Sequence, residues 1–228
     1  MGGVNYLLYA KQRQLAKAGN SKNFANFVNI VRPNYKMTMN TPTLYIIAGC
    51  NGAGKTTASM TVLPEVLDCH EFVNADEMAK GLSPFRPEEV AIDAGRLMLK
   101  RIDYLLSKKE TFAIETTLAT KSYKNLVDRA KKIGYTTILL FFWLPSPEMA
   151  EQRVAARVIS GGHNIPLETI HRRYWLGLKN LFSIFVPIVD FWSLYDNSDN
   201  AVCIVKNNLA IDENKLKEIK KTCQNKIE

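Results

Sequence analysis

The sequence lacks the features that mark membrane and secreted proteins. Its longest uninterrupted apolar run, residues 138–144, is far too short to cross a bilayer. The N-terminus has no charged start followed by an apolar core and a small-residue cleavage site, so it does not predict a secretory signal. We therefore expect a cytoplasmic protein with no membrane partner.

Cysteine and histidine are also scarce. The four cysteines are scattered without a C-x-x-C pair, and the three histidines do not cluster. This pattern argues against a disulfide framework and against a zinc site, and it favours reduced thiols.

Positive charge is abundant but uneven. The net charge is +8, and residues 1–36 carry six Lys and Arg side chains with no Asp or Glu, which leaves +2 for the rest. A basic arm for an acidic partner, a packing extension, a disordered leader and a start codon placed too early are all compatible with this segment. Because six spread charges form no dense patch, nucleic acid is not an expected partner. We expect a basic N-terminal extension over residues 1–40 and a main domain over residues 41–228.

One stretch dominates what is present. Residues 49–56 read GCNGAGKT and match G-x-x-x-x-G-K-[ST] at every fixed position. In such a loop the backbone N–H groups curl around a phosphate, and the following helix points its positive end there. Lys55 can then reach the β- and γ-phosphates, and the Thr56 hydroxyl can ligate Mg²⁺. The stretch predicts binding of ATP with Mg²⁺, and the expected contacts are Gly49, Asn51, Gly52, Ala53, Gly54, Lys55, Thr56 and Thr57.

Predicted strands and helices alternate from residue 41 onward. The expected strands cover residues 44–48, 71–75, 111–115, 135–144 and 201–205, with an edge segment near residues 193–195. The expected helices cover residues 55–62, 88–106, 122–133, 148–159, 167–185 and 212–226, and Pro64 is expected to end the first of them. This succession predicts an α/β fold with a mostly parallel central sheet, in which ligands gather at the carboxyl ends of the strands.

Two carboxylates fall at predicted strand ends, on the same edge as the phosphate loop. Asp76 follows the second strand and Glu115 ends the third. A phosphotransferase needs a carboxylate near the acceptor hydroxyl, to accept its proton or to hold it in line. Each residue also has a simpler interpretation, because Asp76 could cap the next helix and Glu115 could pair with a structural cation.

Four arginines flank a glycine-containing loop at residues 160–166. Arg153 and Arg157 lie four positions apart and share a helix face, and Arg172 and Arg173 follow the loop. Guanidinium groups placed in this way could stabilise the transferred phosphoryl group as part of a closing lid, or they could form a solvated face.

A family resemblance rests on seven segments that occur in a fixed order along the chain. They are GCNGAGKTT, FVNADEMAKGLSP, AIDAGRLML, FAIETTL, WLPSPEMAEQRVAARVISGGHNIP, IHRRYWLGLKNLF and LYDNS. From Tyr45 to Asn197 the chain resembles the zeta-toxin-like group of P-loop kinases. The resemblance implies a three-layer P-loop kinase-like fold. It also implies a kinase whose acceptor is a UDP-linked N-acetylamino sugar, phosphorylated at its 3′-hydroxyl, and an antitoxin that blocks the ATP site.

The same resemblance implies a role for individual residues. ATP and Mg²⁺ would sit over Lys55 and Thr56, and Asp76 would be the base for the acceptor hydroxyl. The residues implied to hold the substrate or to stabilise the γ-phosphate are Glu115, Thr116, Arg157, Arg172 and Arg173, with the choice between the last two open.

A different class, the ABC-type ATPase, is the alternative. The phosphate loop reads much like an ABC loop, and residues 160–163 faintly resemble the ABC signature. Against this, Phe191 stands after Ile188-Val189-Asp190, where an ABC Walker B strand would place a catalytic Glu, and no histidine follows His171. The kinase is the stronger prediction.

Overall fold

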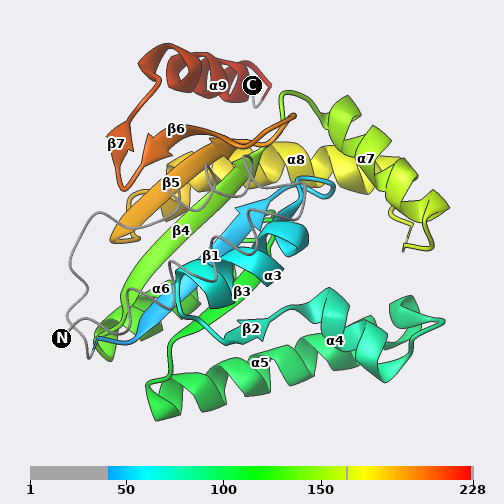
Figure 1. The fold of residues 1–228 in the computed structure, drawn as a ribbon, viewed down its shortest axis with the longest axis vertical. Coiled ribbons are helices and arrows are strands. Elements are labelled where there is room, and N and C mark those ends of the chain that lie inside the picture. The colour runs from blue at the N-terminus through cyan, green and yellow to red at the C-terminus, as the bar shows by residue number, and fades with distance from the viewer. Residues whose placement is uncertain (1–40, 163, 227–228) are drawn as a thin grey trace, which may run out of the picture.

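The chain folds around one mixed sheet. The computed structural model describes residues 41–162 and 164–226. The expected basic extension over residues 1–40 and one position of the glycine-containing loop, His163, lie outside these ranges. Within the described residues the strand order is β2-β3-β1-β4-β5-β6-β7 (Figure 1). The first five strands in this order pair in parallel, and β6 and β7 are antiparallel. The strands are β1 Thr43–Gly49, β2 Glu71–Val73, β3 Phe112–Thr116, β4 Thr136–Trp143, β5 Phe191–Asp196, β6 Val202–Lys206 and β7 Leu209–Ala210.

Helices connect the parallel strands. The helices are α3 Lys55–Val66, α4 Ala75–Leu82, α5 Ala91–Lys108, α6 Tyr123–Lys132, α7 Pro147–Ile159, α8 Leu167–Asn180 and α9 Glu213–Asn225. A 3₁₀ turn, η1 (Pro87–Val90), precedes α5, and a π-helical turn, η2 (Leu181–Phe185), follows α8. No helix in the described part of the chain is both long and apolar enough to cross a membrane.

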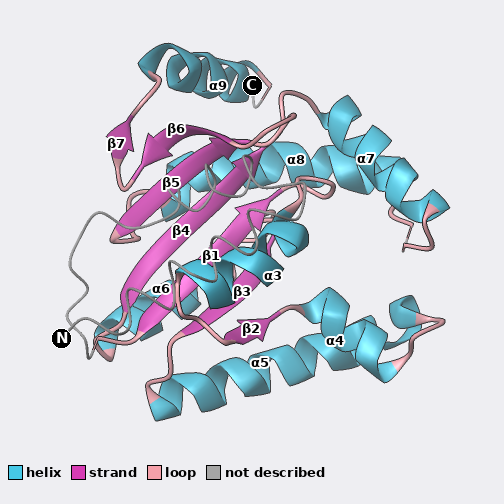
Figure 2. Cartoon of the chain, in the orientation of Figure 1, coloured by secondary structure: helices cyan, strands magenta, loops and turns pink. Residues whose placement is uncertain are grey.

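The helices cover both faces of the sheet (Figure 2). Tyr45 and Ile47 of β1 face a core that includes α3 and α7, whereas Leu44 and Ile46 face a core that includes α5, α6 and α9. Successive side chains of a strand point to opposite faces, so β1 is buried on both sides. This double burial accounts for the uninterrupted apolar run before the phosphate loop. The predicted three-layer α/β fold is confirmed.

The prediction that Pro64 ends the first helix is wrong. Helix α3 continues to Val66 and includes Pro64. Proline removes one backbone donor and is most disruptive in a helix interior. Here it lies in the last turn, and the N–H of Leu67 closes the helix on the carbonyl of Val62 at 3.1 Å.

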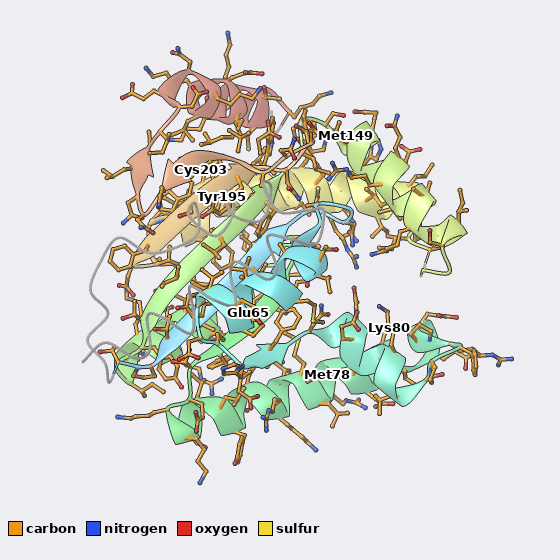
Figure 3. All side chains as sticks on the ribbon, in the orientation of Figure 1. Glu65, Met78, Lys80, Met149, Tyr195 and Cys203 are labelled. Carbon is orange, nitrogen blue, oxygen red and sulfur yellow. The ribbon has the colours of Figure 1, made fainter. Side chains whose placement is uncertain are left out.

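The prediction of an edge segment near residues 193–195 is also wrong. Strand β5 lies between β4 and β6, and the two-residue β7 forms the edge. Ser193 makes the segment read as a surface strand, but it is buried and its hydroxyl accepts the N–H of Asn207 at 3.1 Å. Tyr195 of β5 and Cys203 of β6 lie side by side in the ladder (Figure 3).

Candidate functional site

The phosphate loop connects the carboxyl end of β1 to α3. Gly49, at φ 143°, and Gly54, at φ 80°, adopt backbone conformations that L side chains rarely take. A Cβ atom on Gly49 would also collide with the backbone carbonyl of Phe142 on β4. These constraints explain why glycine stands at both fixed glycine positions of the motif.

Helix α3 begins at the loop without a side-chain cap. Its N-cap residue is Gly54, whereas Asn74, Ser146 and Asp212 cap α4, α7 and α9 with side-chain oxygens. The first N–H groups of a helix have no intrahelical partner, and together with the helix dipole they attract an anion. Helix α3 therefore presents free amide donors where the motif predicts phosphate.

Glu115 contacts both functional side chains of the loop. The Thr56 hydroxyl donates to Glu115 Oε1 and Oε2 at 3.1 and 2.9 Å, and Lys55 Nζ lies 3.7 Å from Oε1. The parallel register of β3 and β1 pairs Glu115 with Ile47 and so brings it beside the loop. Lys55 Nζ also donates to the carbonyl of Cys50 at 3.0 Å. The Lys55 and Glu115 side chains are only 7% and 10% exposed, so this charged pair is held largely out of water.

The environment of Glu115 opposes its ionisation. Burial raises the pKa of Glu115 above 4.5, while the charge of Lys55 and the Thr56 hydrogen bond lower it; Asp76 and Glu77 raise it further. A carboxylate of this kind gains from the arrival of a cation, which favours the ionised form.

Asp76 lies in the first turn of α4, beyond the strand. Strand β2 ends at Val73, and Asn74 Oδ1 accepts the N–H groups of Asp76 and Glu77 at 2.9 and 3.4 Å. The other end of the same amide, Asn74 Nδ2, donates to Glu115 Oε2 at 2.9 Å. Asn74 is thus the helix cap, and Asp76 keeps an exposed carboxylate whose charge acts on Glu115. The simpler interpretation of Asp76 as the cap is wrong.

The residues after β3 form a turn that α8 holds in place. Leu118 is fully buried with φ at 56°, an unusual conformation for a non-glycine residue. Asn180 Nδ2 donates to the Leu118 carbonyl at 2.7 Å, and Gly177 makes room for the Thr117 carbonyl, which a Cβ atom would strike. The hydroxyl of Thr116, a predicted substrate residue, accepts the N–H of Leu118 at 3.0 Å.

Tyr123 borders both this turn and Asp76. Burial raises the pKa of the Tyr123 hydroxyl above 10, a hydrogen bond with Thr116 lowers it, and the charge of Asp76 raises it. The sequence gives no signal for Tyr123, because its proximity to Thr116 and Asp76 depends on tertiary packing and not on a local motif.

Two of the four arginines support the loop region. Arg173 Nη1 donates to Asn51 Oδ1 within the phosphate loop at 3.3 Å. Arg153 Nη2 donates to the carbonyl of Ser198, after β5, at 2.6 Å. These contacts hold α7 and α8 against the loop and its neighbour.

The other two arginines are exposed. Arg157 lies in the last turn of α7, where the N–H of Gly162 folds back onto the Arg157 carbonyl at 2.9 Å. Arg172 lies on α8, next to Arg173. Helix α7 projects past the carboxyl edge of the sheet on the side opposite α4, and Met149 and Lys80 mark these two sides in Figure 3. Helix α7, which carries Arg157, and helix α4, which carries Asp76, therefore lie on opposite sides of this edge.

The segment that follows β5 contacts the phosphate loop through Asn197. Asn197 Nδ2 donates to the Ala53 carbonyl at 2.8 Å, and the Asn197 N–H donates to the Trp143 carbonyl at 3.0 Å. The phosphate-loop motif cannot reveal this contact, because Ala53 and Asn197 are 144 positions apart.

Comparison with known proteins places this geometry in a family context. The Zeta toxin family model matches residues 30–209. An uncharacterized protein of Haemophilus influenzae (strain ATCC 51907 / DSM 11121 / KW20 / Rd) is 29% identical over 126 residues, which cover 55% of this chain and 88% of that protein.

Two solved structures share the fold. The PezAT chromosomal toxin–antitoxin system of Streptococcus pneumoniae matches with a TM-score of 0.57 and 17% identity, over 90% of this chain and 93% of that chain. The AvrRxo1-ORF1:-ORF2 complex with ATP matches with a TM-score of 0.63 and 16% identity, over 94% of this chain and 70% of that chain.

Proposed function

Because the chain belongs to the zeta toxin family, we propose that it is an ATP-dependent kinase that transfers the γ-phosphoryl group to a hydroxyl of a small molecule. The observation that carries this proposal is the contact of Glu115 with both Lys55 and Thr56, beside the exposed carboxylate of Asp76. In this proposal Glu115 would serve the nucleotide and its metal, and Asp76 would serve the acceptor.

ATP would bind with its phosphates at the N-terminus of α3. The uncapped amides and Lys55 supply donors and positive charge for them. A protein complex of similar fold has been solved with ATP, which supports this nucleotide.

The side chains beside the loop fit Mg²⁺. This ion prefers oxygen ligands and is usually held by one or two carboxylates together with substrate phosphates. Thr56 and Glu115 bring a hydroxyl and a carboxylate within 3.1 Å of each other, so they would hold it. When bound, Mg²⁺ neutralises charge on the phosphates.

Asp76 would accept the proton of the acceptor hydroxyl. Its carboxylate is exposed and near Glu115, and the cap formed by Asn74 fixes the turn that carries it. Arg157 and Arg172, whose side chains are exposed, would stabilise charge on the γ-phosphoryl group, and Arg173 contacts Asn51 of the phosphate loop. In this proposal Glu115, predicted from the sequence to hold the substrate, would instead organise the metal.

Family membership also suggests the acceptor and a partner. We propose a UDP-linked N-acetylamino sugar as the acceptor, with transfer to its 3′-hydroxyl. The similar PezAT structure is a toxin–antitoxin system, which supports a cognate antitoxin as the protein partner. We also retain residues 1–40 as a separate basic extension, although the family match begins at residue 30.

Transfer of label from γ-³²P-ATP to a panel of UDP-sugars tests the proposal. We expect labelled product with UDP-N-acetylamino sugars in the presence of Mg²⁺, and none with Lys55→Ala, which loses nucleotide affinity. Labelling of an acceptor outside this panel would reject the UDP-sugar and keep the kinase. Release of inorganic phosphate with no labelled acceptor would favour a hydrolase instead.

A further inference from the structure

We propose that Asn197 is a positioning residue that sets the orientation of the phosphate loop for the nucleotide. The inference rests on the proposed nucleotide binding but not on phosphoryl transfer. Asn197 Nδ2 donates to the carbonyl of Ala53 at 2.8 Å. Ala53 immediately precedes Gly54, the N-cap residue of α3, so this bond acts at the start of the anion-binding helix end.

The bond fixes the peptide between Ala53 and Gly54. A peptide unit is planar and trans, so its carbonyl and its N–H point in opposite directions. With the Ala53 carbonyl turned toward Asn197, the N–H of Gly54 is turned away from Asn197. That N–H is one of the first amide donors of α3, which no carbonyl of the helix can satisfy. Asn197 thereby holds one donor of the phosphate cradle in its working orientation.

The main chain at Asn197 is itself firmly supported. Its N–H donates to the carbonyl of Trp143, the last residue of β4, at 3.0 Å. The next residue, Ser198, donates its N–H to Asp196 Oδ1 at 2.9 Å and accepts Arg153 Nη2 at 2.6 Å. A side chain that projects from such a segment can impose its geometry on the loop.

The absence of a side chain at Gly54 leaves room for the Asn197 amide. A Cβ atom at Gly54 would come within 2.7 Å of Asn197 Nδ2, so only glycine admits the amide at its present distance. The amide must also be a donor, because the Ala53 carbonyl is an acceptor. An aspartate of nearly the same shape would instead set a carboxylate against that carbonyl and near the bound phosphates.

Calorimetric titration of inorganic tripolyphosphate, ATP and adenosine tests the proposal. Asn197→Ala should lower the affinity for ATP and for tripolyphosphate by about tenfold each, which is the scale of one charge-assisted hydrogen bond. The affinity for adenosine should not change. Asn197→Asp should weaken the two phosphate ligands further. The matched control is Asn200→Ala, in the same segment, where the exposed Asn200 amide contacts Asp199; it should bind like the wild type.

Each other outcome is decisive. Wild-type affinity of Asn197→Ala for tripolyphosphate would overturn the proposal, as would an equal loss of affinity for adenosine, which indicates general disruption. If circular dichroism shows that neither Asn197 variant folds, the residue serves the fold and the proposal is overturned. A wild type that binds tripolyphosphate but labels no acceptor would reject the kinase alone, whereas one that binds no tripolyphosphate would reject both proposals.

Discussion

The Thr56 hydroxyl donates to both carboxylate oxygens of Glu115, at 3.1 and 2.9 Å. The two residues come from different βα units, and the pairing of β1 with β3 brings them together. A carboxylate from another strand therefore orients the hydroxyl that is expected to ligate Mg²⁺.

The folded protein should become less stable as pH rises because Glu115 ionises, and Glu115→Gln should abolish this pH dependence. Because the folded protein raises the pKa of Glu115, the stability contributed by its protonated form is complete below 4.5 and is lost as pH rises through the raised value. Glutamine does not ionise, so without ligands the Tm of Glu115→Gln relative to wild type should rise as the pH increases from 4.5 to 8. Thermal melts across this range check the prediction, and a difference that does not change with pH would contradict it.

Asp76→Asn should separate binding from chemistry. The asparagine keeps the size of the side chain but removes the base, so phosphoryl transfer should fall by about 10²- to 10⁴-fold while ATP affinity stays nearly unchanged. Single-turnover transfer and calorimetry measure the two effects. The control is Glu77→Gln in the same helical turn, whose side chain pairs with Lys80 at 2.6 Å. Transfer at the wild-type rate by Asp76→Asn would remove Asp76 from the mechanism.

Gly177→Ala should destabilise the protein even though alanine favours helices. The new Cβ atom would strike the Thr117 carbonyl in the turn after β3, and such overpacking costs roughly 1–3 kcal/mol. In α5, a Cβ atom on Gly95 meets nothing within 4 Å, so Gly95→Ala should be neutral or stabilising by up to about 1 kcal/mol. Urea unfolding measures the free energy of unfolding of both variants. Equal changes in the two variants would contradict the prediction and show that the turn after β3 moves aside at little cost.

Asp190→Asn should weaken the fold and spare catalysis. Asp190 immediately precedes β5, so it lies at the amino end of that strand, whereas the phosphate loop lies at the carboxyl ends of the strands. Its carboxylate accepts hydrogen bonds from the Thr137 N–H and hydroxyl at 2.8 Å each, and it forms an ion pair with Lys131 at 2.9 Å. Losing the charge in these bonds should cost roughly 1–2 kcal/mol. An ABC-type ATPase that used Asp190 as its Walker B carboxylate would instead lose ATP turnover, so a turnover assay separates the two classes.

The stability difference for Asp190→Asn should itself depend on pH. Burial acts to raise the pKa of Asp190, but hydrogen bonds from Lys131 and Thr137 outweigh it and lower the pKa below 3.8. The contribution of Asp190 is therefore present above 3.8 and is lost as pH falls through the lowered value. The variant and the wild type should converge in strong acid.

Sequence reasoning succeeds here where the signal is local. The phosphate loop is set by the spacing of two glycines, Lys55 and Thr56, and the central strands follow from their unbroken apolar runs. The helix after β2 is missed because Asn74 reads as strand but caps α4. The place of β5 inside the sheet is missed because a buried partner, the N–H of Asn207, satisfies Ser193. Contacts such as Asn180 with Leu118 depend on the packing of elements remote in sequence, and no local pattern contains them.

The bond between Ala53 and Asn197 also has a consequence for synthesis, because it spans 144 positions. The phosphate loop leaves the ribosome long before Asn197, the residue that holds it, has been synthesised. A nascent or prematurely terminated polypeptide that stops before residue 197 cannot complete this arrangement, whatever its other helices and strands have achieved. Under the proposal above, the full affinity for a nucleotide is therefore reached only after residue 197 has been synthesised.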